Sequence, residues 1–138
     1  MTAEFPLAVH ALVYLMHTQR ITSSQELADN ICTNPARVRK VMTKLQNAGF
    51  VEATRGQGSG YCFRAAETLT LHEVLKALEE DPISMNWRSG DMDKECLISS
   101  GMGQIMDHLY GQLNDVCQKE LAKVTIGSIS RQIFGLEG

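Results

Sequence analysis

The sequence predicts a mainly helical fold with one small β-hairpin. Two short apolar stripes with helical spacing lie close together in residues 23–49, strand-like runs flank a glycine-rich loop in residues 50–64, and one long helical stripe covers residues 99–124. Apolar residues at i, i+3, i+4 and i+7 indicate a helix that buries one face, whereas short runs of β-branched and aromatic residues indicate strands.

The first short helix is predicted to begin after Ser23. Glu26 follows three residues later, which is the spacing of a capping box, in which two side chains satisfy free amides of the first turn. Leu27, Ala28 and Ile31 then share one face and would pack into the core.

The second short helix is predicted to begin at Pro35, directly after Asn34, and to end at Gly49. Asparagine is a favoured N-cap, and proline suits the first helical position because its missing amide would have no partner there. The apolar stripe of this helix is formed by Val38, Val41, Met42 and Leu45. Its remaining surface is basic and carries Arg37, Arg39, Lys40 and Lys44. A basic helix of this kind, a short turn after another helix, fits the recognition helix of a helix-turn-helix in a DNA major groove, and a solvated basic face is the alternative.

The hairpin that follows resembles a wing. Its loop, residues 55–60, begins with Arg55, includes Gln57 and contains three glycines. An arginine at such a position can enter a minor groove, where the negative potential is enhanced. A phosphate-binding loop would require a helix after the glycines, and here a strand follows.

Charge is segregated along the chain. The net charge is −3, yet residues 35–66 hold six basic residues and one acidic residue. A local basic patch attracts phosphate regardless of the total charge. The modest size of this patch predicts that two copies cooperate on one DNA site.

The long stripe of residues 99–124 predicts a helix of roughly 24 residues, about 36 Å in length. A helix of this length lacks a core of its own so far from the short helices, so we expect it to pair with the same helix of a second copy in an isologous dimer. An amphipathic helix that packs within the chain is the alternative.

The chain is thus predicted to have three regions: residues 1–82 for DNA binding, residues 83–98 as an irregular hinge and sensing segment, and residues 99–138 for dimerisation, ending in a short helix.

Several motifs together resemble one bacterial family of dimeric winged helix-turn-helix regulators, which includes IscR, NsrR and CymR. The matching residues lie at 27–28, 38–42, 45, 48–51, 55–61, 69–74 and 77–79. The resemblance implies a homodimer that binds a double-stranded DNA operator, and a sensing function in the hinge segment. Its iron–sulfur members carry three closely spaced cysteines before the long helix, whereas this chain has only Cys96 there. We therefore expect no cofactor.

The cysteines suggest a thiol switch instead. Cys32 lies just before the basic helix and near Arg37, and a helix N-terminus and a nearby cation both favour the reactive thiolate. Cys96 lies in the hinge segment. We hypothesise that oxidation joins Cys32 to Cys96 of a second copy and releases DNA. Alternatively the cysteines are inert, and a small molecule or protein partner is sensed near Trp87 and Met85.

Other classes of protein are disfavoured. No nucleophile–base constellation indicates an enzyme, and His10, His17, His72 and His108 lack the spacing of metal ligands. The N-terminus has no basic region followed by an apolar run, and no stretch approaches the roughly 20 apolar residues that span a bilayer. We therefore expect a cytoplasmic protein without a membrane partner.

The prediction is thus a homodimeric, sequence-specific repressor. Its expected DNA contacts come from the recognition helix and the wing, at Asn34, Arg37, Arg39, Lys40, Lys44, Arg55 and Gln57. Its expected redox-sensing residues are Cys32 and Cys96.

Overall fold

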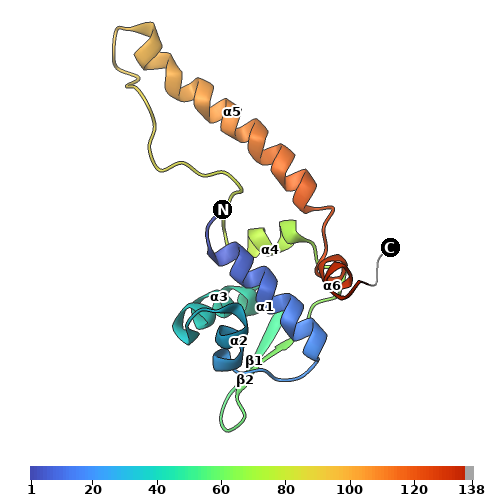
Figure 1. Ribbon diagram of the computed structural model, residues 1–138. Helices are drawn as coiled ribbons and strands as arrows, with labels where there is room; N and C mark the ends of the chain where they lie inside the picture. The colour runs from blue at the N-terminus through green and yellow to red at the C-terminus, as the bar shows by residue number, and fades with distance from the viewer. Residues whose placement is uncertain (136–138) are drawn as a thin grey trace.

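A computed structural model describes residues 1–135 of the chain. This part contains helices and one two-stranded antiparallel sheet, in the order α1 (Glu4–Thr18), α2 (Ser24–Ile31), α3 (Pro35–Asn47), β1 (Val51–Thr54), β2 (Gly60–Phe63), α4 (Leu71–Ala77), α5 (Leu97–Leu121) and α6 (Ile126–Phe134). Figure 1 shows α1–α4, the hairpin and α6 gathered together, while α5 projects away from them. The predicted fold class, mainly helical with a β-hairpin wing and a long C-terminal helix, is confirmed.

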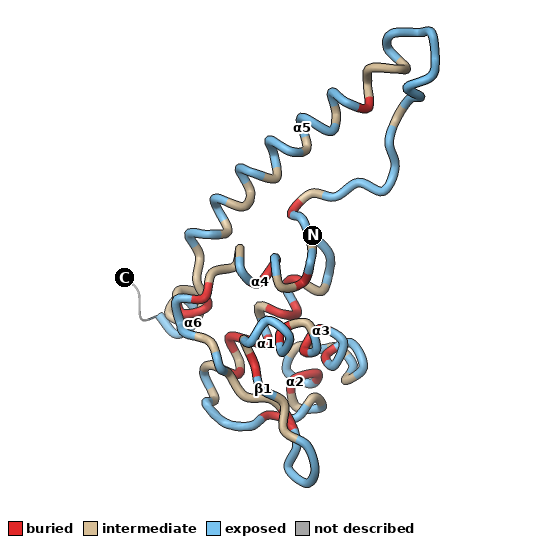
Figure 2. The backbone as a smooth tube through the Cα atoms, turned by 180° about the vertical axis from the view of Figure 1, so that it is seen from behind, coloured by how far each residue is buried: buried red, intermediate tan, exposed pale blue. Residues whose placement is uncertain are grey.

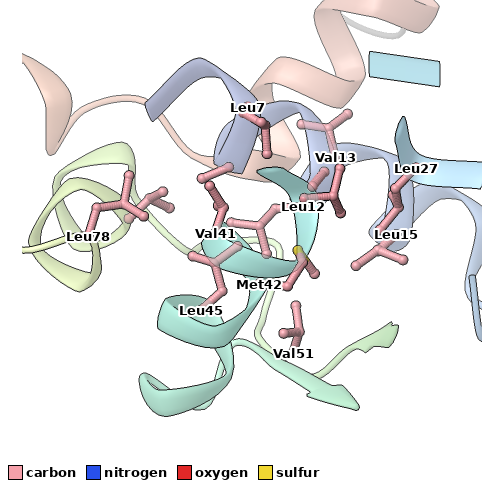
Figure 3. Close-up of a cluster of buried hydrophobic side chains, with 14 of the residues drawn as sticks. Leu7, Leu12, Val13, Leu15, Leu27, Val41, Met42, Leu45, Val51 and Leu78 are labelled. Carbon is pink, nitrogen blue, oxygen red and sulfur yellow. The ribbon is translucent and has the colours of Figure 1, made fainter. Parts of the chain in front are cut away.

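The core is built around α1. The side chains of Ala8, Ala11, Leu12 and Leu15 are fully buried, and α1 contacts α2, α3, α4, α6 and β2. Figure 3 shows leucine and valine side chains of α1 meeting those of α3 and the start of the hairpin. Fully burying one such side chain stabilises the fold by about 1.5–3 kcal/mol, so this cluster fixes how α3 is presented.

The capping box predicted at the start of α2 is only half formed. The Ser23 hydroxyl accepts the amide of Glu26 at 3.0 Å, as a capping residue does. The reciprocal half of the predicted capping box is absent, because the Glu26 carboxylate instead accepts hydrogen bonds from Tyr14 at 2.6 Å and from Arg20 at 2.6 Å. The charged Arg20 guanidinium is the stronger donor, and its hydrogen bond is the main reason that the pKa of Glu26 is lowered.

The wing is joined to the turn between α1 and α2. Strands β1 and β2 pair with Val51 opposite Phe63 and Thr54 opposite Gly60. On its other edge β2 forms an isolated bridge, in which Thr22 and Tyr61 exchange backbone hydrogen bonds of 2.8 and 2.9 Å. A Cβ atom at Gly60 would lie 2.4 Å from the Thr22 carbonyl oxygen, so this close approach requires glycine.

Helix α4 is short and capped at its start. Thr70 and Glu73 form a complete capping box there. The helix ends at Ala77, and Glu79 then adopts a left-handed φ of 58°. The buried Leu78 side chain closes the helix against the core.

Helix α6 returns to the body of the protein. Thr125 caps α6 and pairs with Thr70 in an isolated β-bridge. Ile126, the first residue of α6, is fully buried among the residues of the core. The short final helix is therefore held against α1 and α4 by both backbone and side-chain contacts.

Helix α5 lies outside this core. Within α5 only Gly103 is buried (Figure 2). Its apolar stripe faces solvent in the single chain, with exposed fractions of 64% for Ile105, 42% for Leu109, 40% for Leu113 and 61% for Val116. Among residues 1–135, the body of the protein leaves these four side chains of the 25-residue helix at least 40% exposed.

None of the helices formed by residues 1–135 combines the length and the apolar character needed to cross a membrane.

Replacing Ile126 with alanine tests the attachment of α6. We expect Ile126→Ala to lower the free energy of unfolding by about 2–4 kcal/mol, because it leaves a cavity in the core. Urea denaturation at fixed protein concentration measures the change. Ile21→Ala is the matched control, since Ile21 is 46% exposed and its loss should change stability by less than about 0.5 kcal/mol. Equal effects of the two substitutions would contradict the assignment of α6 to this core.

Candidate nucleic-acid interface

The N-terminal end of α3 presents an ordered polar surface. The Asn34 side-chain oxygen accepts the amide of Arg37 at 3.0 Å, which confirms the predicted N-cap. This bond uses one lone pair of the carboxamide oxygen, and the NH₂ group of Asn34 can still donate to a DNA base or phosphate. Asn34 and Arg37 are both exposed.

The turn before α3 is tight. Cys32 ends α2 in a left-handed conformation with a φ of 67°. The amide of Thr33 donates to the Ala28 carbonyl at 2.9 Å. This geometry fixes the direction in which the chain enters α3, and it leaves the Cys32 side chain exposed.

Three basic residues of this region are paired with carboxylates. Lys44 Nζ lies 2.9 Å from Glu4 Oε2, and Lys40 Nζ lies 3.3 Å from Glu4 Oε1. The hydrogen bond from Lys44 lowers the pKa of Glu4 and raises that of Lys44. Arg64 similarly bonds Glu52 across the hairpin at 2.6 Å.

The other basic residues form no ion pair with any of residues 1–135: these are Arg37, Arg39 and Arg55. Arg39 donates a long hydrogen bond of 3.4 Å to the hydroxyl of Ser24, the first residue of α2. An exposed guanidinium without a carboxylate partner retains its full charge for a phosphate or a base edge. The structure therefore divides the predicted cationic residues into a partly neutralised group and an available group.

The wing loop carries Arg55 and Gln57 in exposed positions. Gly56 and Gly58 have φ values of 91° and 74°, which glycine adopts without strain. The Thr54 hydroxyl closes the base of the loop by accepting the Gly60 amide at 3.2 Å. Figure 1 shows this loop and the α2–α3 pair at the same end of the molecule, remote from the far end of α5.

Glu4 is the residue of this region that the sequence analysis missed. Its side chain is only 18% exposed and meets two lysines of α3. Glu4 and Lys44 are 40 positions apart in the chain, so no local spacing relates them. The indication that the sequence did contain was an isolated acidic residue at the start of an otherwise apolar helix.

The cysteines lie on separate elements. Cys32 ends α2, Cys62 lies in β2, Cys96 precedes α5 and Cys117 lies within α5. An iron–sulfur cluster requires several converging thiolates, and residues 1–135 contain no group of three or more histidine, cysteine or acidic side chains that could hold a metal ion. Within one chain, the residues present do not fit such a cluster.

Cys96 has a distinctive electrostatic environment. It is exposed at the N-terminus of α5, where the backbone amides of Ser99 and Ile98 lower the pKa of its thiol. These two amides belong to the first turn of α5, at the positive end of the helix.

Comparison with known proteins decides the family. Residues 1–132 match the Rrf2 family, which is described as "Iron-dependent Transcriptional regulator". The chain belongs to the Rrf2 family. The Rrf2 family consists of DNA-binding transcriptional regulators rather than enzymes, which agrees with the resemblance that the sequence motifs indicated.

Individual Rrf2 relatives agree with this assignment. The chain is 21% identical to YwnA of Bacillus subtilis, a candidate HTH-type transcriptional regulator, over 93% of this chain and 95% of YwnA. It is 39% identical to the HTH-type transcriptional regulator IscR of Cereibacter sphaeroides, over 38% of this chain and 35% of that protein. The crystal structure of a candidate transcriptional regulator from Lactobacillus plantarum has a TM-score of 0.83 at 20% identity, covering 96% of this chain and 91% of that one, and so shares its fold.

Removing the Glu4 charge tests its pairing with the two lysines. In Glu4→Gln we expect tighter binding to random-sequence DNA, because Lys40 and Lys44 become free for phosphates. The slope of log affinity against log salt concentration should steepen by about 1–2, as expected for up to two new phosphate contacts. Fluorescence anisotropy across a salt series measures both quantities.

Glu120→Gln is the matched control for this substitution. Glu120 forms an exposed ion pair with Lys123, far along the chain from α3. Its loss should leave the affinity for DNA and the salt slope unchanged. Indistinguishable behaviour of the two variants would show that Glu4 does not restrain the lysines.

Proposed function

We propose that this Rrf2 regulator is a cytoplasmic, homodimeric, sequence-specific repressor. The observation that carries the proposal is the set of exposed arginines without acidic partners in residues 1–135, which lies on α3 and the wing: Arg37, Arg39 and Arg55. In this proposal α3 enters the major groove with Asn34, Arg37, Arg39 and Lys40. The wing reaches the flanking minor groove with Arg55 and Gln57.

Lys44 has a secondary part in the proposal. Its side chain is 34% exposed, and its ammonium is bonded to Glu4. We assign it a phosphate contact that operates only when the Glu4 pair opens. Lys40, whose side chain is 72% exposed, is freer to turn toward DNA.

Dimerisation through α5 is supported by its exposed apolar stripe. A second copy could cover this stripe by pairing the two helices about a two-fold axis. A further apolar groove of about 640 Å³ lies between α1 and α6, lined by residues that include Phe5, Val9, Val13, Ile129 and Phe134. In this proposal the partner's long helix binds in the groove, and α1 becomes part of the interface.

Substitution of Arg37 tests the recognition helix. We expect Arg37→Ala to weaken binding to an operator from the gene's own upstream region by about 1–3 kcal/mol, with loss of discrimination against random DNA. Electrophoretic mobility shifts on both DNAs measure this ratio.

Lys44→Ala is the comparison for that substitution. Because Glu4 already neutralises Lys44, this change should affect operator and random DNA alike, and should alter the salt slope by at most about 1. Equal loss of discrimination in the two variants would refute the proposed division between them.

We further propose that Cys32 and Cys96 sense oxidants. Both thiols are exposed, and the lowered pKa of Cys96 increases its thiolate fraction at neutral pH. Within one chain, the end of α2 and the start of α5 lie at opposite ends of the molecule (Figure 1). A disulfide requires Cα atoms within about 7 Å, so the proposed bond joins Cys32 of one protomer to the partner's Cys96.

Mild oxidation with diamide, which accepts the two electrons and two protons of the thiols, tests this switch. Wild-type protein should release the operator and migrate as a cross-linked dimer on a non-reducing gel. Cys32→Ser and Cys96→Ser should each abolish both effects. Cys117→Ser should retain them, since Cys117 lies half-buried within α5. Unchanged operator binding by oxidised wild type would eliminate the switch and leave the other part of the proposal intact.

A further inference from the structure

The segment between α4 and α5 is fastened to α5 rather than free. At one end, the Ile83 amide donates to the Asn114 side-chain oxygen at 2.7 Å, and the Asn114 side-chain NH₂ returns a bond to the Ile83 carbonyl at 3.0 Å. At the other end, the Asp91 amide donates to the Ser99 carbonyl at 3.0 Å. The segment therefore runs antiparallel to α5 between these two points.

A third attachment lies between them. The Arg88 guanidinium bonds the Asp107 carboxylate at 3.1 Å. A Cβ atom on Gly103 would come within 2.4 Å of the Arg88 guanidinium carbon, so Arg88 lies directly over this glycine. This contact explains why Gly103 is the buried residue of α5.

These attachments enclose a cavity of about 520 Å³ between the segment and α5. Besides the Arg88–Asp107 pair, its walls are formed by Met85, Trp87, Ser89, Met102, Met106 and Tyr110. Trp87 is the single tryptophan of the chain, and 75% of its surface is exposed. Met85 is 59% exposed and lines the same cavity, so the two side chains together form an exposed apolar patch, which is a mark of a binding surface.

We propose that this cavity binds a neutral aromatic molecule carrying one hydrogen-bonding group. Its volume lies within the range of about 300–1,000 Å³ found for small-molecule sites. The indole ring offers a stacking surface, and the three methionines supply adaptable sulfur–aromatic contacts. Among residues 1–135, the two charged side chains that line the cavity, Arg88 and Asp107, are bonded to each other, which favours a neutral ligand. The hydroxyls of Ser89 and Tyr110 are the available hydrogen-bonding groups.

Such a ligand would tighten the attachment of the segment to α5 and thereby alter how α5 meets α4, which ends shortly before Ile83. The regulatory consequence rests on the proposed DNA-binding function. The binding site itself does not, and it can be tested without DNA.

Intrinsic fluorescence tests the site directly, because all tryptophan emission comes from Trp87. The probe is 4-nitrobenzyl alcohol, a neutral aromatic quencher with one hydroxyl group, titrated into the full-length protein. We expect saturable quenching of the wild-type protein. Met106→Glu places a charge in the cavity, so its affinity for the probe should be lower by about tenfold or more. Met92→Glu is the matched control, since Met92 is exposed on the same segment but does not line the cavity; it should bind within about twofold of wild type.

A second variant tests the chemistry of the lining independently of Met106. Arg88→Met leaves the Asp107 carboxylate without its partner, so preference should shift from the neutral probe to 4-nitrobenzylamine, its cationic counterpart. Quenching that rises linearly without saturation, or equal affinities of Met106→Glu and Met92→Glu, would overturn the proposal. So would Trp87 emission that responds to protein concentration but not to the probe, because a second copy would then cover the cavity. Operator release, measured afterwards with the same probe, separates failure of the site from failure of DNA binding.

Discussion

The position of α1 is the constraint on which the other elements depend. Small residues, Ala8 and Ala11, are fully buried on α1 and allow close approach of its neighbours, while Leu12 and Leu15 fill the space between them. Helix α1 contacts α2, α3, α4, α6 and β2, so it sets the position of α3 relative to both the wing and the C-terminal part of the chain. The same helix places Glu4 against the lysines of α3, so the core also sets how much positive charge the surface presents.

Charge distribution in the folded protein is more selective than the linear sequence indicates. Residues 35–66 contain six basic residues, yet carboxylates bond three of them, at Lys40, Lys44 and Arg64. The arginines that remain are the residue type best suited to bidentate recognition of bases and phosphates. Pairing Lys40, Lys44 and Arg64 with carboxylates while three arginines stay unpaired among residues 1–135 reduces attraction to DNA in general relative to attraction to a particular site. This arrangement is consistent with a regulator that must find one operator among many competing sequences.

Sequence reasoning was reliable where the deciding interactions are local. The N-caps at Ser23 and Asn34 and the helix spacing of α3 depend on neighbours within one or two turns, and all were predicted. The reciprocal Glu26 cap was wrong because Tyr14 and Arg20, which belong to α1 and the following turn, compete for the same carboxylate. The Glu4 pairs and the cavity beside Trp87 depend on tertiary contacts between distant segments. The sequence hypothesis did name Trp87 and Met85 for an effector, but no spacing in the chain relates them to the α5 side of the cavity or relates Glu4 to the lysines.

The bridge between Thr70 and Thr125 has a consequence for how the chain is organised. The amide of Leu71 bonds the Val124 carbonyl at 2.9 Å, and the amide of Ile126 bonds the Leu69 carbonyl at 2.8 Å. The chain therefore returns to the body of the protein beside the start of α4, after passing through α4, the segment beside Trp87 and all of α5. Insertions are best tolerated where their two ends lie close together. In this architecture the segment beside Trp87 and α5 form an insertion between α4 and α6, whose length and chemistry can change while the body around α1 keeps its geometry.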